Sequence, residues 1–430
     1  MKRFLLLLLL SVPVFLLAQS AMSLDDCIRL AYKQNPAVRN GVIGIKETKA
    51  DYIASVGAFL PHIVVNAETG KRFGRSLDPD TNGYTSESFE EGTVGLDMTL
   101  SLFEGFSRIN QVRFRKMNKE RSEWELKEKQ NELAYQVTDA YYKLILERKL
   151  LDLALEQSRL SERYLKQTEV FVELGLKSAS DLQEVKARRE GDIYRYQSRE
   201  NSSRIALLHL KQLMNIQPGD TLAILDTITA SQLPPYSVST VETLYAQSIE
   251  ILPSIRMIDL KQKAAHKEYA IAGGASVFAR FTVGSNYYNT AFSARQLRDN
   301  IGKYVGVGIS FPLLSGLQRL TNQRKLKLNM YRLKNEEELE KQQLYTDIEQ
   351  TLLSLHTGYS EHQQALSQLD AETLVLKESE RKWEEGLISV FQLMEARNRF
   401  IAAKAELVRV RLQIEMMMKL EKYYRQGTFL

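Results

Sequence analysis

The sequence of 430 residues predicts a mainly helical protein that contains the same architecture twice. Each half is expected to hold a β-hairpin followed by a very long helical hairpin. Three observations predict this fold. Proline, the strongest helix breaker, is absent between Pro79 and Pro218 and again after Pro312. Glycines recur at matching positions in the two halves, and runs of alternating apolar and polar residues precede both proline-free stretches.

The composition excludes several classes of function. Hydrophobic residues make up 44% and charged residues 26% of the chain, which is typical of a folded protein. The net charge of +5 argues against a nucleic-acid binder with a concentrated basic patch. The single cysteine, Cys27, rules out an intramolecular disulfide framework and a cysteine-cluster metal site. No two histidines lie at the i, i+4 spacing of a helical zinc site.

The N-terminus is predicted to be a signal peptide over residues 1–18. Lys2 and Arg3 form a short basic start, an almost wholly apolar run follows, and the small residues Ala18 and Ala21 offer cleavage sites. The alternative is a buried N-terminal helix. No later segment has the ~20 continuous apolar residues of a transmembrane helix. We therefore expect an exported protein that, if it enters a membrane, does so as a β-barrel.

The spacing of four glycines indicates an internal duplication. Gly105 and Gly175 are 70 residues apart, as are Gly316 and Gly386, and the two pairs are offset by 211 residues. The flanking residues match at the same offset: Leu-Phe-Glu-Gly with Leu-Leu-Ser-Gly, and Gly-Leu-Lys-Ser with Gly-Leu-Ile-Ser. A repeat of about 200 residues is too long for a solenoid unit, so a two-fold duplication is expected.

The segment between Gly105 and Gly175 is expected to be one helix, because it is rich in good helix formers. At ~1.5 Å per residue it would be a rod of roughly 100 Å. A second helix is expected to about Met214, and residues 316–386 and 389–424 repeat the arrangement. Each half would then be an antiparallel helical hairpin that turns at Gly175 or Gly386. A coiled-coil-like stripe supports the first helix: Leu133, Val137, Ala140, Leu144, Leu151 and Leu155.

Alternating residues ahead of each long helix predict strands. Residues 93–102 and 304–311 have the period of two expected for a strand with one apolar face, and residues 63–68 and 279–284 are weaker partners. β-Hairpins are therefore expected at about 62–103 and about 277–313. Strands near ten residues are long enough to cross a bilayer. The alternative is a soluble sheet that packs on one face.

The expected organisation follows from these elements. The signal peptide is followed by a first repeat over 19–215, which also contains short helices. A linker or equatorial segment covers 216–240, and the second repeat, which begins with a helix, covers 241–430. Because one chain supplies four strands and the smallest membrane barrels need about eight, a membrane protein of this build requires an oligomer. Helical hairpins that extend from such a barrel would form a hollow duct.

Several further motifs lie in a consistent order along the mature chain. They are the segments 24–28 and 35–36, the strand end 102–106, the Ala-Tyr-Tyr segment 140–142, and the Gly-Leu-x-Ser motifs at 175–182 and 386–393. With these marks the chain resembles the TolC-like outer-membrane efflux proteins. The resemblance implies a homotrimer with a twelve-stranded β-barrel in the outer membrane and a periplasmic α-helical tunnel.

The resemblance also implies function and partners. The expected function is a passive outer-membrane exit duct of a tripartite efflux pump or a type I secretion system, which carries small molecules or proteins. The expected partners are a periplasmic adaptor (membrane fusion) protein, an inner-membrane pump and outer-membrane lipid, in a double-membraned bacterium.

The turns of the two helical hairpins are the first candidate site. A chain that reverses between two helices needs a residue comfortable at positive φ, which glycine supplies. The serine three residues later is placed to cap the returning helix. The resemblance adds a contact with the adaptor at these tips, whereas an ordinary turn is the alternative. The expected contact residues are Gly175, Leu176, Ser178, Gly386, Leu387 and Ser389.

The resemblance places a constriction just beyond the tips. The expected gate residues are Asp181, Gln392 and Glu395, and Gln392 stands where the family has an acid, so one ring of carboxylates would be missing. Ile388 stands where some members have a closing basic residue, and Trp383 could take an aromatic role. A ring of Glu395 side chains would favour cations. The alternatives are a solvated helix surface for the acids and simple packing for Trp383.

No enzyme signature is present. The sequence lacks a Gly-x-Ser-x-Gly elbow, a phosphate-binding loop and a dinucleotide fingerprint, so no catalytic residue, cofactor or metal is expected. One alternative function is a soluble periplasmic coiled-coil protein, structural or adaptor-like. It would explain the helices but not the duplicated strands. A second alternative, an exported enzyme, has no support in the sequence.

Overall fold

The computed structural model describes residues 21–77, 83–226, 233, 239–277, 280–290, 301–310 and 316–430. The predicted signal peptide at 1–18 lies outside the described residues. Parts of the predicted linker at 216–240 and of the loops within the two predicted β-hairpins also lie outside them.

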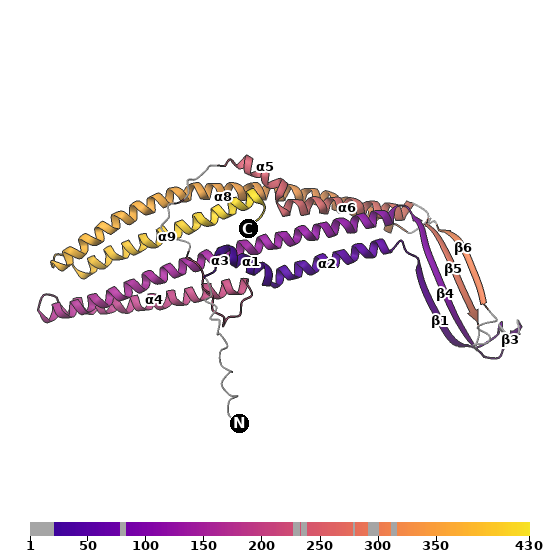
Figure 1. Ribbon diagram of the computed structural model, residues 1–430, viewed down its shortest axis with the longest axis horizontal. Coiled ribbons are helices and arrows are strands. Elements are labelled where there is room, and N and C mark those ends of the chain that lie inside the picture. Colours follow the sequence, from indigo (N-terminus) through magenta and orange to yellow (C-terminus); the bar gives the residue numbers. More distant parts are fainter. Residues whose placement is uncertain are drawn as a thin grey trace, which may run out of the picture. The chain divides into compact units, whose positions relative to one another are not determined.

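The fold is mainly helical with a few strands, as the sequence predicts (Figure 1). Each half of the chain contributes two long helices, which are α3 (Ser107–Glu173) and α4 (Ala179–Leu213), then α8 (Gln318–Glu384) and α9 (Val390–Gln426). The shorter helices are α1 (Leu24–Gln34), α2 (Pro36–Gly57), α5 (Val241–Ile251) and α6 (Pro253–Val277). None of the described helices combines the length and the hydropathy that a membrane-spanning helix needs.

The chain packs into two compact units that do not coincide with the two repeats of the sequence. The tip unit consists of the described residues within Met1–Arg39, Lys129–Ser248 and Tyr345–Leu430, and the sheet unit consists of those within Asn40–Glu128 and Ile249–Leu344. Each unit takes segments from both halves, because α3 and α8 continue from one unit into the other. The duplication is therefore a repeat of chain segments rather than a pair of consecutive domains.

The apolar stripe of α3 forms part of the core of the tip unit. Val137 and Leu144 are fully buried, and Leu133 and Ala140 are nearly so. Leu151 and Leu155 are only partly buried. Tyr141 lies on the same buried surface, and its hydroxyl donates a hydrogen bond of 2.6 Å to the carbonyl oxygen of Leu225. The stripe thus reflects helix packing, as expected for a period near 3.5 residues.

The strands form two antiparallel sheets, the larger of which has the order β1-β4-β5-β6. Its strands are β1 (His62–Arg72), β4 (Phe89–Glu104), β5 (Arg280–Thr290) and β6 (Ile301–Ser310). The short strands β2 (Ser76–Leu77) and β3 (Tyr84–Thr85) pair with each other. Each half of the chain therefore contributes one hairpin to the larger sheet, and β4 pairs with β5 across the two halves.

The register of the larger sheet separates an apolar face from a polar face. Val65 lies opposite Leu96, and Val283 lies opposite both Leu100 and Val307, so these side chains share one face. On the other face, Asn66 donates a hydrogen bond of 2.7 Å to the carboxylate of Asp97. That face also carries small and polar residues of the neighbouring strands, among them Thr99, Gly284 and Gly306.

The apolar face of the larger sheet is exposed. Val65 is 68% exposed, and Val305 and Val307 are 77% and 67% exposed. The sheet therefore does not pack its apolar face against the described residues, which argues against the soluble alternative. The outer strands β1 and β6 each pair on one side only within the described residues.

At the junction between the strands and the helices, the backbone of α6 closely approaches the start of α3. The Ser107 hydroxyl donates a hydrogen bond of 3.0 Å to the carbonyl oxygen of Ile271. A Cβ atom at Gly274 would lie 2.7 Å from Ser107 Oγ and closer still to the carbonyl oxygen of Gly105. Only glycine lets the two backbones come this close.

We predict that Gly274→Ala destabilises the sheet unit. The added methyl group would meet rigid backbone, and overpacking of this kind costs about 1–3 kcal/mol. Gly273→Ala is the matched control, because its Cβ would meet only the end of Gln323, at 3.5 Å. The melting temperatures of both variants are measured by thermal unfolding of the purified protein in detergent. A melting temperature for Gly274→Ala equal to that of the control would contradict the prediction.

Candidate functional site

The two long helical hairpins end in turns of the same geometry. Gly175 and Gly386 have φ angles of +72° and +76°, the left-handed region that glycine tolerates. Next to them, the Leu176 amide donates to the Phe171 carbonyl and the Leu387 amide donates to the Lys382 carbonyl, both at 2.8 Å. These bonds close a Schellman motif at the ends of α3 and α8.

Capping boxes begin both returning helices. Ser178 Oγ accepts a hydrogen bond of 3.1 Å from the Asp181 amide, and the Ser178 amide donates to the Asp181 carboxylate at 3.0 Å. At the second tip, Ser389 Oγ accepts from the Gln392 amide at 3.3 Å, and the Ser389 amide donates to Gln392 Oε1 at 3.0 Å. Gln392 thus makes the reciprocal bond that an acid makes at the first tip.

Both tips present an apolar side chain to solvent. Leu176 is 67% exposed and Leu387 is 69% exposed. Because both ends of each turn are held by hydrogen bonds, these leucines project from an ordered backbone. Their contact with an adaptor stays a prediction.

The three expected gate residues are placed as follows. Asp181 and Gln392 lie in the first turns of α4 and α9, where each takes part in its own capping box. Glu395 accepts a hydrogen bond of 3.0 Å from Arg399, which also contacts Glu372 of α8. None of the three is bonded to another of them within the described part of the chain. Their gate role stays a prediction.

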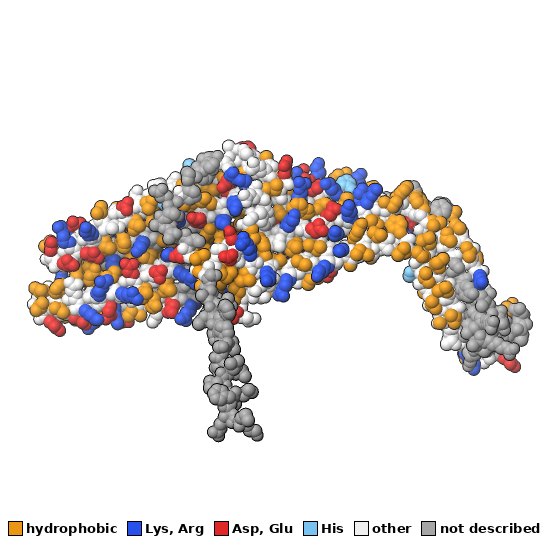
Figure 2. Space-filling view, viewed as in Figure 1, with side chains coloured by type: hydrophobic (Ala, Val, Ile, Leu, Met, Phe, Trp, Pro, Cys, Tyr) orange, Lys and Arg blue, Asp and Glu red, His pale blue; other side chains and the backbone are white. Residues whose placement is uncertain are grey.

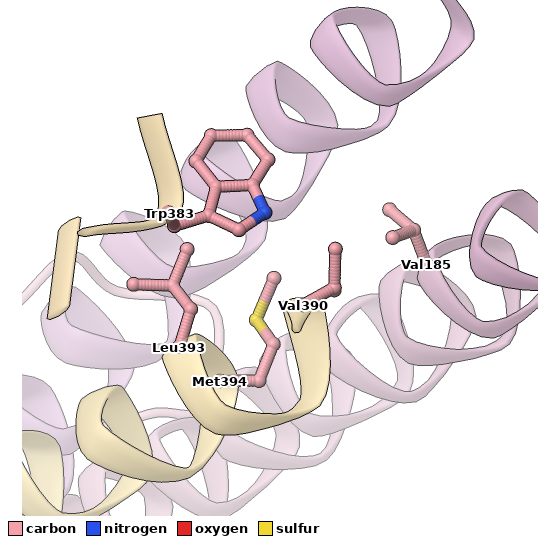
Figure 3. Packing of buried hydrophobic residues seen from close by; sticks show 5 residues of the cluster. All are labelled: Val185, Trp383, Val390, Leu393 and Met394. Atoms are coloured by element: carbon pink, nitrogen blue, oxygen red, sulfur yellow. The ribbon is translucent and has the colours of Figure 1, made fainter. Parts of the chain in front are cut away.

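Trp383 packs close to the tips, where all four long helices meet. Its indole is 2% exposed and lies with Val185 of α4 and with Val390, Leu393 and Met394 of α9 (Figure 3). Its ring contacts those of two partly buried residues of α3, at centroid distances of 5.1 Å for Tyr164 and 5.8 Å for Phe171.

The apolar packing also accounts for Ile388. This side chain is partly buried against the cluster around Trp383. An apolar residue therefore fills the position at which some members of the resembled family have a basic residue. In this chain the second tip is packed rather than ion-paired at that point.

A buried polar network that was not predicted from the sequence lies in the same unit. Asp192 of α4 is 1% exposed, and its carboxylate accepts hydrogen bonds from Gln157 at 2.9 Å, from Arg195 at 2.5 Å and from Ser161. Gln157 also donates to Asn398 of α9 at 3.4 Å. In a charged helix Asp192 looks like a solvated residue. Asp192 lies seven residues after Val185, so both residues lie on one face of α4, and this spacing is the one sequence feature that could have indicated the burial of Asp192.

A buried cation lies beside this network. Arg397 of α9 is 3% exposed, and its guanidinium lies 5.4 Å from the centre of the Tyr164 ring. Burial lowers the pKa of Arg397, although the nearby Tyr164, Asp192 and Glu380 act in the opposite direction. Polar contacts thus connect α3, α4 and α9, and the Tyr164 hydroxyl extends them to α8 through a hydrogen bond of 3.4 Å that it donates to Glu380.

The described residues offer no evident metal centre. No group of three or more His, Cys, Asp or Glu side chains among them could hold a metal ion. The candidate site is therefore a pair of structured turns with exposed leucines, supported by a packed junction of four helices.

We predict that acid loosens the first tip but not the second. Hydrogen bonds from the Ser178 amide and hydroxyl lower the pKa of Asp181 below its ordinary value of 3.8. A lowered folded-state pKa means that the stabilisation is present above the unfolded pKa and is lost as pH falls through the folded one. The equivalent Gln392 does not titrate.

The measurement is amide hydrogen exchange, corrected for the intrinsic effect of pH, at the first turns of α4 and α9. Between pH 7 and pH 3, protection should fall at α4 and persist at α9. An equal fall at both tips would contradict the prediction, because the second capping box has no carboxylate.

Part of the chain matches a known protein family. Residues 27–215 match the family model described as outer membrane efflux protein. No curated protein matches the chain.

Solved structures share the fold over almost the whole chain. The Campylobacter jejuni CmeC outer membrane channel has a TM-score of 0.83 at 13% identity, covering 94% of this chain and 85% of its own. Vibrio cholerae VceC, an outer membrane protein, has a TM-score of 0.78 at 14% identity, covering 95% and 97%. The Neisseria gonorrhoeae MtrE outer membrane channel has a TM-score of 0.76 at 16% identity, covering 95% and 89%.

These likenesses extend over both repeats, and the family match covers most of the first. The match to the outer membrane efflux protein family is thus confined to residues 27–215, whereas the fold of the chain as a whole is that of the solved outer-membrane channels.

Proposed function

We propose that the protein is the outer-membrane exit duct of an efflux or type I secretion machine. The observation that carries this proposal is the larger sheet, which exposes an apolar face and a polar face at once. A sheet in water normally buries its apolar face, whereas a sheet between lipid and an aqueous channel needs both faces. The polar face, with Asn66 and Asp97, would line the channel.

The edges of the sheet support an oligomeric duct. β1 and β6 have eleven and ten residues, and neither is paired on its outer side within the described residues. In lipid each unpaired backbone group costs on the order of several kcal/mol. Pairing β6 of one copy with β1 of the next would remove this cost. Three copies, as in the family that the chain resembles, would close a sheet of twelve strands.

The tips are the proposed docking surface for the partners. Leu176 and Leu387 are exposed on turns held by capping boxes and Schellman bonds, which suits contact with the helical hairpins of a periplasmic adaptor. An inner-membrane pump would supply the energy and choose the cargo. The duct itself would be passive, and Asp181, Gln392 and Glu395 would line its constriction.

The two alternative functions explain fewer features of the structure. A soluble coiled-coil protein would leave the apolar face of the sheet, with Val305 77% exposed, in water. An exported enzyme gains no support from the family model that residues 27–215 match, which describes outer membrane efflux proteins.

The first test is the mass of the native particle, extracted with detergent from isolated outer membranes and corrected for bound detergent. A particle of three mature chains is expected, because three copies close the sheet. A water-soluble monomer or dimer, released by periplasmic washing, would overturn the proposed function. Digestion of the washed cells with a protease that cannot cross the membrane provides a control for intact compartments.

The second test concerns the tips. Gly175→Val combined with Gly386→Val should reduce export severalfold while leaving membrane insertion and trimer formation intact. Both positions have positive φ, where a side chain costs about 1–2 kcal/mol. Gly191→Val is the control, since Gly191 lies inside α4 and only the end of Arg195 approaches its added Cβ, at 3.9 Å. Normal export by the double variant would count against the tip assignment.

A further inference from the structure

The start of α3, next to the sheet, has one face that is first apolar and then basic. Ile109, Arg113 and Lys116 follow each other at steps of four and three, so they lie on the same side of the helix. Ile109 is 42% exposed, and both cations are exposed as well. Lys116 has one long ion pair, 4.0 Å from the partly exposed Glu120, which adds little in water.

The second repeat carries the same face. Leu320, Arg324 and Lys327 of α8 occupy the equivalent positions, at the offset of 211 residues that relates the two repeats. Leu320 is 66% exposed, and Arg324 and Lys327 are exposed. Neither of these two cations has an acidic partner in the described part of the chain, and the same is true of Arg113.

The turn before each face adds an exposed apolar side chain. Phe106 is 56% exposed and the equivalent Leu317 is 73% exposed. Phe106 has a φ of +62°, which is unfavourable for a residue with a side chain. The fold therefore keeps the Phe106 ring more than half exposed, with its edge contact to Phe103 at 5.2 Å, at the point where strand β4 becomes helix α3 and despite a conformational cost.

Positive charge is concentrated beyond these apolar residues. Residues 107–121 contain six Lys and Arg against one carboxylate, and residues 318–334 contain six against none. The whole chain has a net charge of only +5, so these segments are exceptional. Figure 2 shows hydrophobic side chains over the sheet and Lys and Arg side chains on the adjoining part of α6 and α8.

We infer that Arg113, Lys116, Arg324 and Lys327, here called the basic collar, bind the phosphates of anionic phospholipids in the leaflet nearest the helices. The inference rests on the proposed function, in which the sheet crosses the membrane. Acyl chains would cover the apolar face of the sheet. Phe106, Leu317 and their apolar neighbours would lie at the boundary, and the cations would lie among the headgroups.

Contact with another copy of the chain explains the basic collar less well. Both repeats carry cations at equivalent positions, so close packing of copies there would bring like charges together, with only the distant Glu120 carboxylate beside one of the four cations. A lipid phosphate supplies the missing negative charge. The apolar sheet face next to the collar also continues directly into the region that acyl chains would occupy.

The experiment uses the full-length protein reconstituted in phosphatidylcholine vesicles. Spin-labelled phosphatidylglycerol and spin-labelled phosphatidylcholine are compared by the fraction of label that the protein immobilises. The wild type should prefer phosphatidylglycerol. The collar variant combines Arg113→Gln, Lys116→Gln, Arg324→Gln and Lys327→Gln. Its preference for phosphatidylglycerol should be at least about fivefold weaker than that of the wild type, because one cation near an anionic lipid surface contributes about that factor.

A matched variant removes the same charges farther along the same helices: Arg159→Gln, Arg163→Gln, Lys377→Gln and Lys382→Gln. All four are exposed, and none forms an ion pair within 4.0 Å in the described part of the chain. The matched variant should keep the preference. A second variant, Arg113→Lys with Arg324→Lys, should also keep it, because the charge remains.

The outcomes separate this inference from the proposed function. A protein that inserts as a trimer but shows no preference for phosphatidylglycerol overturns only the inference. Equal loss in the matched variant also overturns it, because total charge would then explain the effect. Loss of the trimer in the collar variant would indicate that the basic collar lies between copies of the chain, and it would overturn the inference too. A wild type that does not insert into vesicles overturns both proposals.

Discussion

The larger sheet imposes the constraint on which the rest of the protein depends, because one chain cannot satisfy it. Its four strands leave the outer sides of β1 and β6 without backbone partners among the described residues, and its apolar face is open. In water such a sheet would aggregate through its edges, and in lipid its unpaired groups would be costly. The proposed closure with further copies inside a membrane would solve both problems. The junction at Gly274 then sets how each strand connects to the helices, since it fixes the approach of α6 to α3.

The tip unit solves a different problem, namely how very long helices keep a defined lateral arrangement without a sheet in their own unit. Helices of 67 residues, such as α3 and α8, cannot rely on intrinsic propensity alone for their lateral packing. Trp383 supplies a large buried surface where the four helices meet. Asp192 adds directional contacts, because a buried carboxylate must be surrounded by donors on α3 and α4. Apolar packing and a satisfied polar network thus act together to support the two turns.

The two repeats preserve geometry more strictly than chemistry. Gly175 and Gly386 have nearly the same φ, and the bonds around them have the same pattern. Asp181 and Gln392 differ in charge, yet both complete a capping box. The hydrogen bond needs an acceptor oxygen at that point, and an amide provides one as well as a carboxylate does. The exchange removes a titratable group from one tip while leaving the turn intact.

Local physics explains what could be predicted from the sequence. The long helices follow from good helix formers without proline, the turns from glycine at Gly175 and Gly386, and the strands from alternation, because each signal acts over a few neighbouring residues. The division into two compact units could not be predicted in this way, since it depends on contacts between segments far apart in the chain. The burial of Asp192 and Arg397 belongs to the same class, because a charged residue in a helix looks solvated until another helix covers it. The sequence by itself determined the elements and their duplication. Only the tertiary structure decided which faces are covered, because burial is a property of the packed helices and sheet, not of any one segment.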